Sequence, residues 1–156
     1  MRLLLTPPRL PAGVCEMAPL LPDAGWCVDR LRGTRFAAGI ESIAEQILAH
    51  RFPLLGVTIE TGPEIDWRRD YLHTRSSGTT YSRLVPYLDF DAVGDHKLIW
   101  ELNRHQHLVV LAQAFRFTGR GEFLDEAMRQ VGGWNRANPF LRGINWTSAL
   151  EVAFRA

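Results

Sequence analysis

The chain has 156 residues, of which 46% are hydrophobic and 22% are charged, a composition typical of an ordinary globular protein. Its 18 Lys and Arg residues nearly balance 17 Asp and Glu residues, and the formal charge of +1 argues against a nucleic-acid-binding protein. Apolar runs extend over a few residues, far short of the ~20 that a bilayer-spanning helix needs. The sequence therefore predicts neither a nucleic-acid partner nor a membrane span.

The first 36 residues contain five of the nine prolines and no sustained hydrophobic period. This pattern predicts an irregular N-terminal arm with one helical turn near residues 26–31. Cys15 and Cys27 fit no zinc pattern, which leaves two free thiols or one disulfide as alternatives. The first apolar run ends at Pro7, too early for a signal peptide. The cellular compartment stays undetermined on this evidence.

Hydrophobic spacing predicts a helix over residues 40–51, stopped by Pro53. β-branched alternation predicts a short strand within residues 54–61. Residues 66–91 are rich in Arg, Tyr, Ser and Gly without any period. We expect this segment to form a long surface excursion.

Residues 95–117 contain no Pro or Gly and place apolar side chains on all sides, which predicts one long buried helix. A Gly-rich turn leads to a second helix over residues 122–136. A third helix is expected after a capping box formed by Ser148 and Glu151. Helices joined by short turns predict a mainly α fold built from antiparallel hairpins.

On the first long helix, Trp100, Arg104, His107 and Leu111 are predicted to share one side. A Trp ring can stack on a sugar face and an Arg fork can hold a carboxylate, so this stripe is typical of a saccharide contact. The alternative is an aromatic core position with Arg104 satisfied by backbone carbonyls. His105 and His107 diverge by about 200° on a helix, which argues against a shared metal ion.

A second candidate lies at the start of the third helix, where Asn145 and Trp146 enter a helix N-terminus, a favourable place for an anion. Glu151 and Arg155 are spaced for an ion pair and continue this second candidate site. The alternative is a salt bridge that only stabilises the helix. The sequence contains no nucleophile motif, phosphate-binding Gly loop or dinucleotide fingerprint. The predicted substrate-binding residues are thus Trp100, Arg104, Asn145 and Trp146, and no catalytic residue, metal or cofactor is predicted.

Three segments together resemble the N-terminal helical region of the heparinase II/III-like polysaccharide lyases. They are residues 50–56 (HRFPLLG), residues 95–108 (DHKLIWELNRHQHL) and residues 138–155 with their NP, GINW and LEVAFR motifs; residues 65–67 (IDW) are a further landmark. The resemblance covers residues 37–156 and not the arm over residues 1–36. It implies an incomplete (α/α) toroid of antiparallel helical hairpins, continued elsewhere by more hairpins and a β-sandwich.

Such lyases cleave uronate-containing polysaccharides by β-elimination, using an Asn-His pair and a Tyr that the family places beyond the last residue of this sequence. The resemblance implies that this chain is the front of a longer protein and supplies a wall of the substrate groove for an acidic polysaccharide. It also suggests a periplasmic or extracellular location, although the missing signal peptide leaves the cytoplasm possible.

Two other functions stay open. One is a non-catalytic carbohydrate-binding or scaffold module of a polysaccharide-assembly system. The other is a toroid glycoside hydrolase, which needs two carboxylic acids that flank a cleft. Glu101 and Glu151 are the plausible pair for that role, but Glu151 has a capping or ion-pair role available.

Overall fold

The computed structural model describes residues 24–155, so Cys15 and the predicted arm up to residue 23 lie outside the described residues. The chain divides into two compact units, residues 1–30 and residues 31–156. The first unit ends within α1 (Ala24–Leu31), a helix of eight residues where one turn was predicted. The Arg30 guanidinium lies 5.3 Å from the centre of the Trp26 ring, and Cys27 is a free cysteine.

The second unit contains α2 (Arg35–Leu48), which both starts and ends earlier than the predicted helix. Thr34 sets the start, because its Oγ1 accepts a hydrogen bond from the backbone N–H of Ala37 at 3.3 Å. The chain leaves the helix at His50, whose left-handed backbone (φ 56°) cannot continue it. The prediction that Pro53 stops this helix is wrong, since Pro53 lies inside the following strand.

An antiparallel hairpin follows, formed by β1 (Arg51–Leu54) and β2 (Val57–Glu60). Leu55 and Gly56 at its tip both have positive φ (49° and 81°), as tight two-residue hairpin turns require. Phe52 pairs with Ile59 and both side chains are buried, so one face of the hairpin enters the core. The predicted strand is confirmed as β2, whereas β1 lies where a helix end was predicted.

The segment predicted as a surface excursion is mostly exposed, and a few buried residues anchor it to the core. It contains β3 (Arg69–Asp70), β4 (Arg75–Ser76), a 3-10 turn (Ser82–Leu84) and α3 (Phe90–Val93). Asp70 is fully buried, and its Oδ2 accepts hydrogen bonds from the backbone N–H of Asp95 and from Nδ1 of His73, both at 2.7 Å. Trp67 and Val85 are buried too. These anchors are single residues, so they leave no periodic signal in the sequence.

The single helix predicted over residues 95–117 is in fact two, α4 (His96–Asn103) and α5 (Gln106–Thr118). Arg104 closes α4 by donating its backbone N–H to the carbonyl of Trp100 at 2.9 Å. His105 then adopts a left-handed conformation (φ 61°), which is uncommon for a residue other than glycine. Neither Pro nor Gly marks this break.

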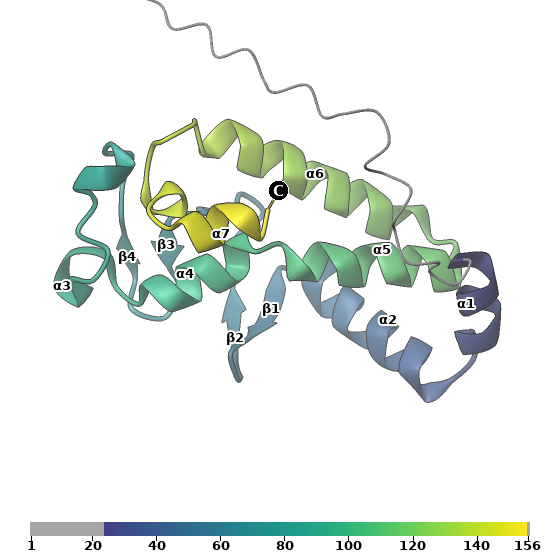
Figure 1. The fold of residues 1–156 in the computed structure, drawn as a ribbon. Coiled ribbons are helices and arrows are strands. Elements are labelled where there is room, and N and C mark those ends of the chain that lie inside the picture. The colour runs from purple at the N-terminus through teal and green to yellow at the C-terminus, as the bar shows by residue number, and fades with distance from the viewer. Residues whose placement is uncertain (1–23, 156) are drawn as a thin grey trace, which may run out of the picture. The chain divides into compact units, whose positions relative to one another are not determined.

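The chain turns back at Gly119 (φ 75°) into α6 (Gly121–Ala137), which confirms the helix predicted over residues 122–136 and its antiparallel hairpin with α5. In Figure 1, α5 packs against both α2 and α6. The core includes Ile47 of α2, Leu111 of α5 and Phe123 of α6, all almost fully buried.

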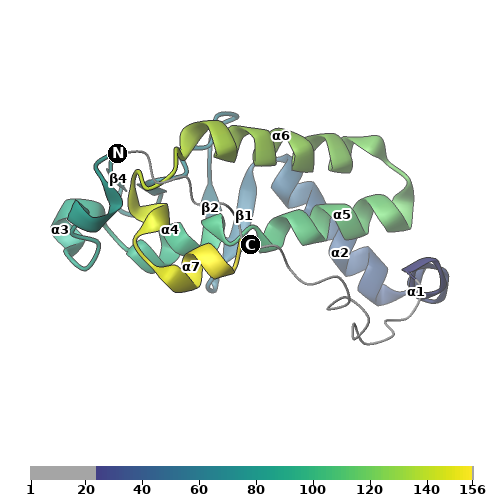
Figure 2. The same cartoon turned by 45° about the horizontal axis from the view of Figure 1, so that its top comes forward.

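Beyond α6, a 3-10 turn (Ile144–Trp146) leads to the short α7 (Ala149–Ala153). This last helix lies beside α4 in the two views of Figures 1 and 2. In the part of the chain that the structure describes, no helix combines the length and apolar character needed to cross a membrane.

Gly94→Ala should lower the free energy of unfolding by about 2–4 kcal/mol. Gly94 has a φ of 81°, and an added Cβ would lie 2.5 Å from Oδ2 of Asp70, the oxygen that holds the Asp95 N–H. Gly56→Ala is the matched control, because Gly56 has the same φ and open space around it. It should lose about 1 kcal/mol from backbone strain alone. Equal losses in chemical denaturation would show that the Asp70 anchor contributes nothing.

Candidate functional site

Two carboxylates hold the side chain of Arg104 at the break between α4 and α5. Nε and Nη2 donate to the Glu151 carboxylate at 3.0 and 2.7 Å, and Nη1 donates to Glu101 at 2.7 Å. Glu151 is 1% exposed, and the Phe154 ring lies 4.8 Å from the guanidinium carbon. Hydrogen bonding to Glu151 is the main cause that raises the pKa of Arg104 above its usual value. This bidentate pair fastens the end of α4 to α7.

The inward turn of Glu151 overturns two predictions. The side chain of Ser148 makes no capping bond to α7, and Glu151 pairs with Arg104 rather than with the start of its own helix. Arg155, predicted to pair with Glu151, instead donates to the backbone carbonyl of Asn145. The capping box and the Glu151–Arg155 ion pair are therefore both wrong.

The α4–α5 break also removes the predicted stripe of Trp100, Arg104, His107 and Leu111. His107 and Leu111 are buried, whereas Trp100 in α4 and Arg104, which caps α4, stay partly exposed. Trp100 donates from Nε1 to the carbonyl of Ile144 at 3.2 Å. The structure thus directs Trp100 and Arg104 toward the 3-10 turn and α7.

Asn145 is fully buried in a network of amides. Its Nδ2 donates to the carbonyl of Trp67 at 3.0 Å and to Oδ1 of Asn138 at 2.8 Å. The same carbonyl accepts from Nδ2 of Asn103 at 2.8 Å, and Oδ1 of Asn103 accepts from Nε1 of Trp134 at 2.7 Å. The network fixes the 3-10 turn against α4 and α6. Asn145 exposes no surface here, so its predicted contact with substrate stays a prediction.

A groove of about 660 Å³ lies beside the second 3-10 turn, Ile144–Trp146. Its lining is Ser82, Arg83, Val85, Tyr87, Leu141, Trp146, Thr147, Ala149 and Val152. Phe140 supports Trp146 edge-on, with ring centres 5.1 Å apart, and Trp100 lies 5.5 Å from Tyr87. Aromatic faces beside an exposed arginine can bind the apolar side of a sugar ring together with an acidic substituent.

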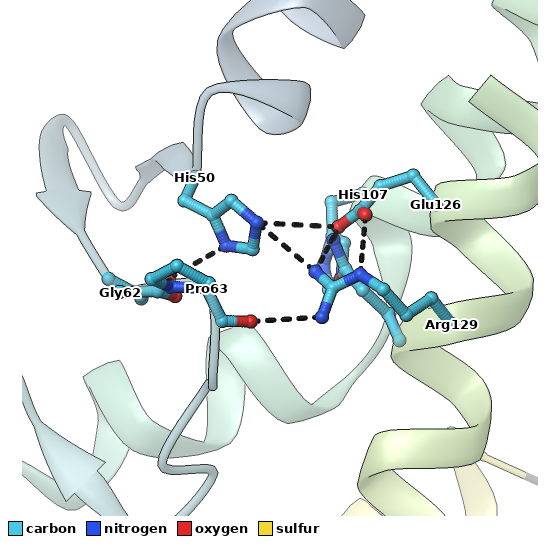
Figure 3. A network of polar contacts seen from close by, with 8 residues as sticks. His50, Gly62, Pro63, His107, Glu126 and Arg129 are labelled. Carbon is cyan, nitrogen blue, oxygen red and sulfur yellow. Dashed lines mark hydrogen bonds and ion pairs between the residues drawn. The ribbon is translucent and has the colours of Figure 1, made fainter. Parts of the chain in front are cut away.

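A second polar cluster joins His50 to α5 and α6 (Figure 3). Arg129 donates to both Glu126 oxygens at 2.7 Å, to the carbonyl of Pro63 at 2.9 Å and to Nε2 of His50 at 3.1 Å. Because arginine can only donate, Nε2 of His50 is the acceptor in this contact. Gln130 donates to Glu126 at 2.6 Å and bonds Nε2 of the buried His107 at 2.7 Å.

His105 and His107 lie with ring centres 6.1 Å apart and nearly perpendicular. Burial lowers the pKa of each to about 4, so both are neutral near pH 7. Over residues 24–155, no group of three or more His, Cys, Asp or Glu side chains is placed to hold a metal ion.

Spacing and motifs assign no role to four polar residues of these networks, and they mark Trp67 and Asn138 only as part of the family resemblance. The four are Asn103, Glu126, Arg129 and Gln130. Asn103, Gln130 and Asn138 are nearly fully buried. A polar residue inside an apolar helix pattern was the available signal for Asn103 and Gln130, because such a side chain must find a buried partner. Nothing in the spacing says which partner that is.

Glu151→Ala should lower the free energy of unfolding by about 3 kcal/mol, because the variant strips Arg104 of its buried partner. Glu101→Ala is the matched control, since it removes the more exposed of the two carboxylates, 16% against 1% side-chain exposure. This control should cost about 1 kcal/mol or less. Equal costs in urea titrations would contradict a dominant Arg104–Glu151 pair.

Lowering the pH should reduce the free energy of unfolding, in part through protonation of His107. Its pKa falls from 6.5 to about 4 on folding, so the unfolded chain takes up the proton first as the pH drops. The contribution of neutral His107 is therefore complete above pH 6.5 and is lost between pH 6.5 and about 4. Between pH 7 and about pH 5 the loss should be roughly 2 kcal/mol. His105 has the same lowered pKa and adds an equal slope, so His107→Gln should remove about half of the pH dependence in denaturation measured at both pH values, and an unchanged slope would refute the assignment.

No family model matches this chain, and no curated protein matches it. Two crystal structures of heparan sulfate lyase HepC from Pedobacter heparinus are similar to it. The mutant form has a TM-score of 0.55 and 24% identity over 75% of this chain and 16% of the lyase chain. The form without that mutation has a TM-score of 0.52 and 23% identity over 78% of this chain and 16% of the lyase chain.

This chain therefore spans about a sixth of the lyase that it resembles. At identities below one quarter, the similarity establishes the fold alone. The chain has a mainly α fold, matching part of a lyase whose helices form an (α/α) toroid.

Proposed function

We propose that this chain is the N-terminal part of the toroid of a polysaccharide lyase, an enzyme that cleaves uronate-containing acidic polysaccharides by β-elimination. The observation that carries the proposal is the fold shared with HepC over three quarters of the chain. The three sequence segments that resemble the heparinase II/III-like lyases support the same assignment.

β-Elimination requires three tasks. The uronate carboxylate must be neutralised, a base must remove the C5 proton, and an acid must protonate the leaving oxygen. Among the described residues, the groove beside the 3-10 turn combines an arginine with aromatic rings rather than a matched acid and base. The proposal accordingly gives this segment a wall of the substrate groove and assigns the proton transfers to the rest of the toroid.

Exposed apolar side chains on the last helices support a continuation of the toroid. Leu124, Met128 and Val131 of α6 are 40–64% exposed. Leu150 of α7 and the following Phe154 are also exposed, at 61% and 50%. Further helical hairpins packed on these positions would bury them, as in a helical array in which each hairpin contacts its neighbours.

At the groove beside the Ile144–Trp146 turn, we propose direct sugar contact for Trp146 and for the neighbouring Trp100. Trp146 lines the groove, and Trp100 is partly exposed beside Tyr87. Arg104 and Asn145 act by positioning in this proposal. Arg104 already faces two carboxylates, and Asn145 holds the turn that carries Trp146.

Trp146→Ala should weaken binding of alginate or heparan sulfate oligosaccharides by about tenfold, the loss expected for one stacked aromatic ring. Phe36→Ala is the matched control, because Phe36 is an exposed aromatic on α2 outside the groove lining. It should leave the affinity unchanged. Isothermal titration calorimetry measures the affinity of both variants, with circular dichroism to check folding. Equal affinities would show that Trp146 makes no contact with the sugar.

The lyase assignment itself is tested on the longer protein that contains this chain. Incubation with a panel of uronate polysaccharides should generate the ultraviolet absorbance of a C4=C5 unsaturated uronate. Binding without this product would support a carbohydrate-binding module instead. Product with a new reducing end but no double bond would support a hydrolase.

A further inference from the structure

A second pocket, of about 320 Å³, lies between α6 and the loop before β3. Its lining is Glu64, Ile65, Trp67, Arg129, Gln130, Gly133, Arg136 and Ala137. It shares no residue with the groove beside Trp146. The function proposed above does not use this pocket.

Gly133 lines one side of the pocket, and Gly132 precedes it in α6. Glycine is disfavoured in a helix interior, yet Gly132 and Gly133 are consecutive within α6. An added Cβ at Gly132 would lie 3.3 Å from Nη1 of Arg136, and one at Gly133 would lie 4.0 Å from Nη2 of Arg136. The bare backbone therefore gives the Arg136 guanidinium a surface on which to lie.

Arg136 makes no hydrogen bond or ion pair with any residue that the structure describes, so its charge has no protein partner there. The indole N–H of Trp67 lies near the same point above Gly133. Its Nε1 atom is 4.0 Å from the position that an added Cβ on Gly133 would occupy. Trp67 is 2% exposed, and no group among residues 24–155 accepts a bond from this N–H. Two donors of different kinds thus converge above Gly133.

Arg129 adds a further donor to this pocket. Four of its five N–H groups are used by Glu126, Pro63 and His50, which leaves one on Nη1. Glu126 neutralises Arg129, whereas the exposed carboxylate of Glu64 is the opposing charge in the lining. The pocket therefore offers donors with one unpaired cation and contains a single acidic residue.

We propose that this pocket binds an oxyanion, namely the carboxylate or sulfate group of an acidic ligand. Arg136 supplies the charge and a planar pair of N–H groups, and the Trp67 indole N–H supplies a directed third bond. Neutral sugars lack the charge that Arg136 requires. This binding is independent of lyase activity, so either proposal can fail alone.

The test titrates the protein with sodium sulfate, sodium glucuronate and neutral glucose while ¹H–¹⁵N NMR follows the Trp67 indole and the arginine Nε–H signals. Sulfate or glucuronate should shift the Trp67 indole signal saturably, and glucose should not. The ion that binds more tightly identifies the substituent, sulfate ester or carboxylate.

Arg136→Ala should weaken the binding of that ion at least about tenfold, as expected for loss of a charge-assisted contact. Arg116→Ala is the matched control, because Arg116 is an exposed arginine on α5 outside the lining. It should leave the affinity unchanged. If both variants lose affinity equally, the effect is net charge and the proposal is overturned.

Two further variants separate binding from folding. Gly132→Ala should raise the melting temperature, because Ala has a higher helix propensity than Gly in α6. The same variant should lower the affinity for the anion by displacing the Arg136 guanidinium. Glu64→Gln should strengthen binding about threefold by removing the opposing charge. Absence of a saturable Trp67 shift with either ion, or unchanged affinity in Gly132→Ala and Glu64→Gln, would overturn the site.

Discussion

The ion pair between Arg104 and the buried Glu151 is the contact on which the arrangement of this chain depends. A helix that breaks without Pro or Gly needs a cause outside its own backbone. Here Arg104 closes α4, His105 takes a left-handed conformation, and the Arg104 side chain reaches α7 through two hydrogen bonds of 3.0 and 2.7 Å. A buried carboxylate without such a partner would be strongly destabilising.

The buried amides extend this constraint to the ligand-binding surfaces. Asn145 and Asn103 share the carbonyl of Trp67, which joins the 3-10 turn, α4 and the loop before β3. On one side the turn presents Trp146 to the aromatic groove. The ring of Trp67 itself lines the oxyanion pocket. One network of neutral hydrogen bonds thus positions residues of both proposed binding surfaces.

The sequence predicted the features that repeat along the chain. The apolar periods of α2 and α6 and the β-branched run in β2 located these elements, although the ends of α2 were shifted because Thr34 and His50 decide them. The break at His105 could not be predicted from spacing, since no Pro or Gly marks it and the apolar pattern runs on across it. The ion pair beside this break joins Arg104 to Glu151, which is 47 residues away along the chain.

For the predicted site residues, too, the sequence indicated the segments but not the contacts that each side chain makes. Trp100, Arg104, Asn145 and Trp146 lie close to the Ile144–Trp146 turn and α7, and their predicted contact with substrate stays a prediction. Their individual roles depend on burial and on partners, which spacing does not encode. The pairing of Arg104 with Glu101 and Glu151, and the complete burial of Asn145, follow from how α4, α6 and α7 pack.

A double-mutant cycle on Arg104→Met and Glu151→Leu isolates the free energy of the contact between these two side chains. We expect a coupling of about 2 kcal/mol or more in chemical denaturation. The double variant should keep its affinity for acidic oligosaccharides, because Arg104 acts by positioning. Additive stability losses, together with an affinity loss that Arg104→Met alone reproduces, would show that Arg104 serves the ligand rather than Glu151.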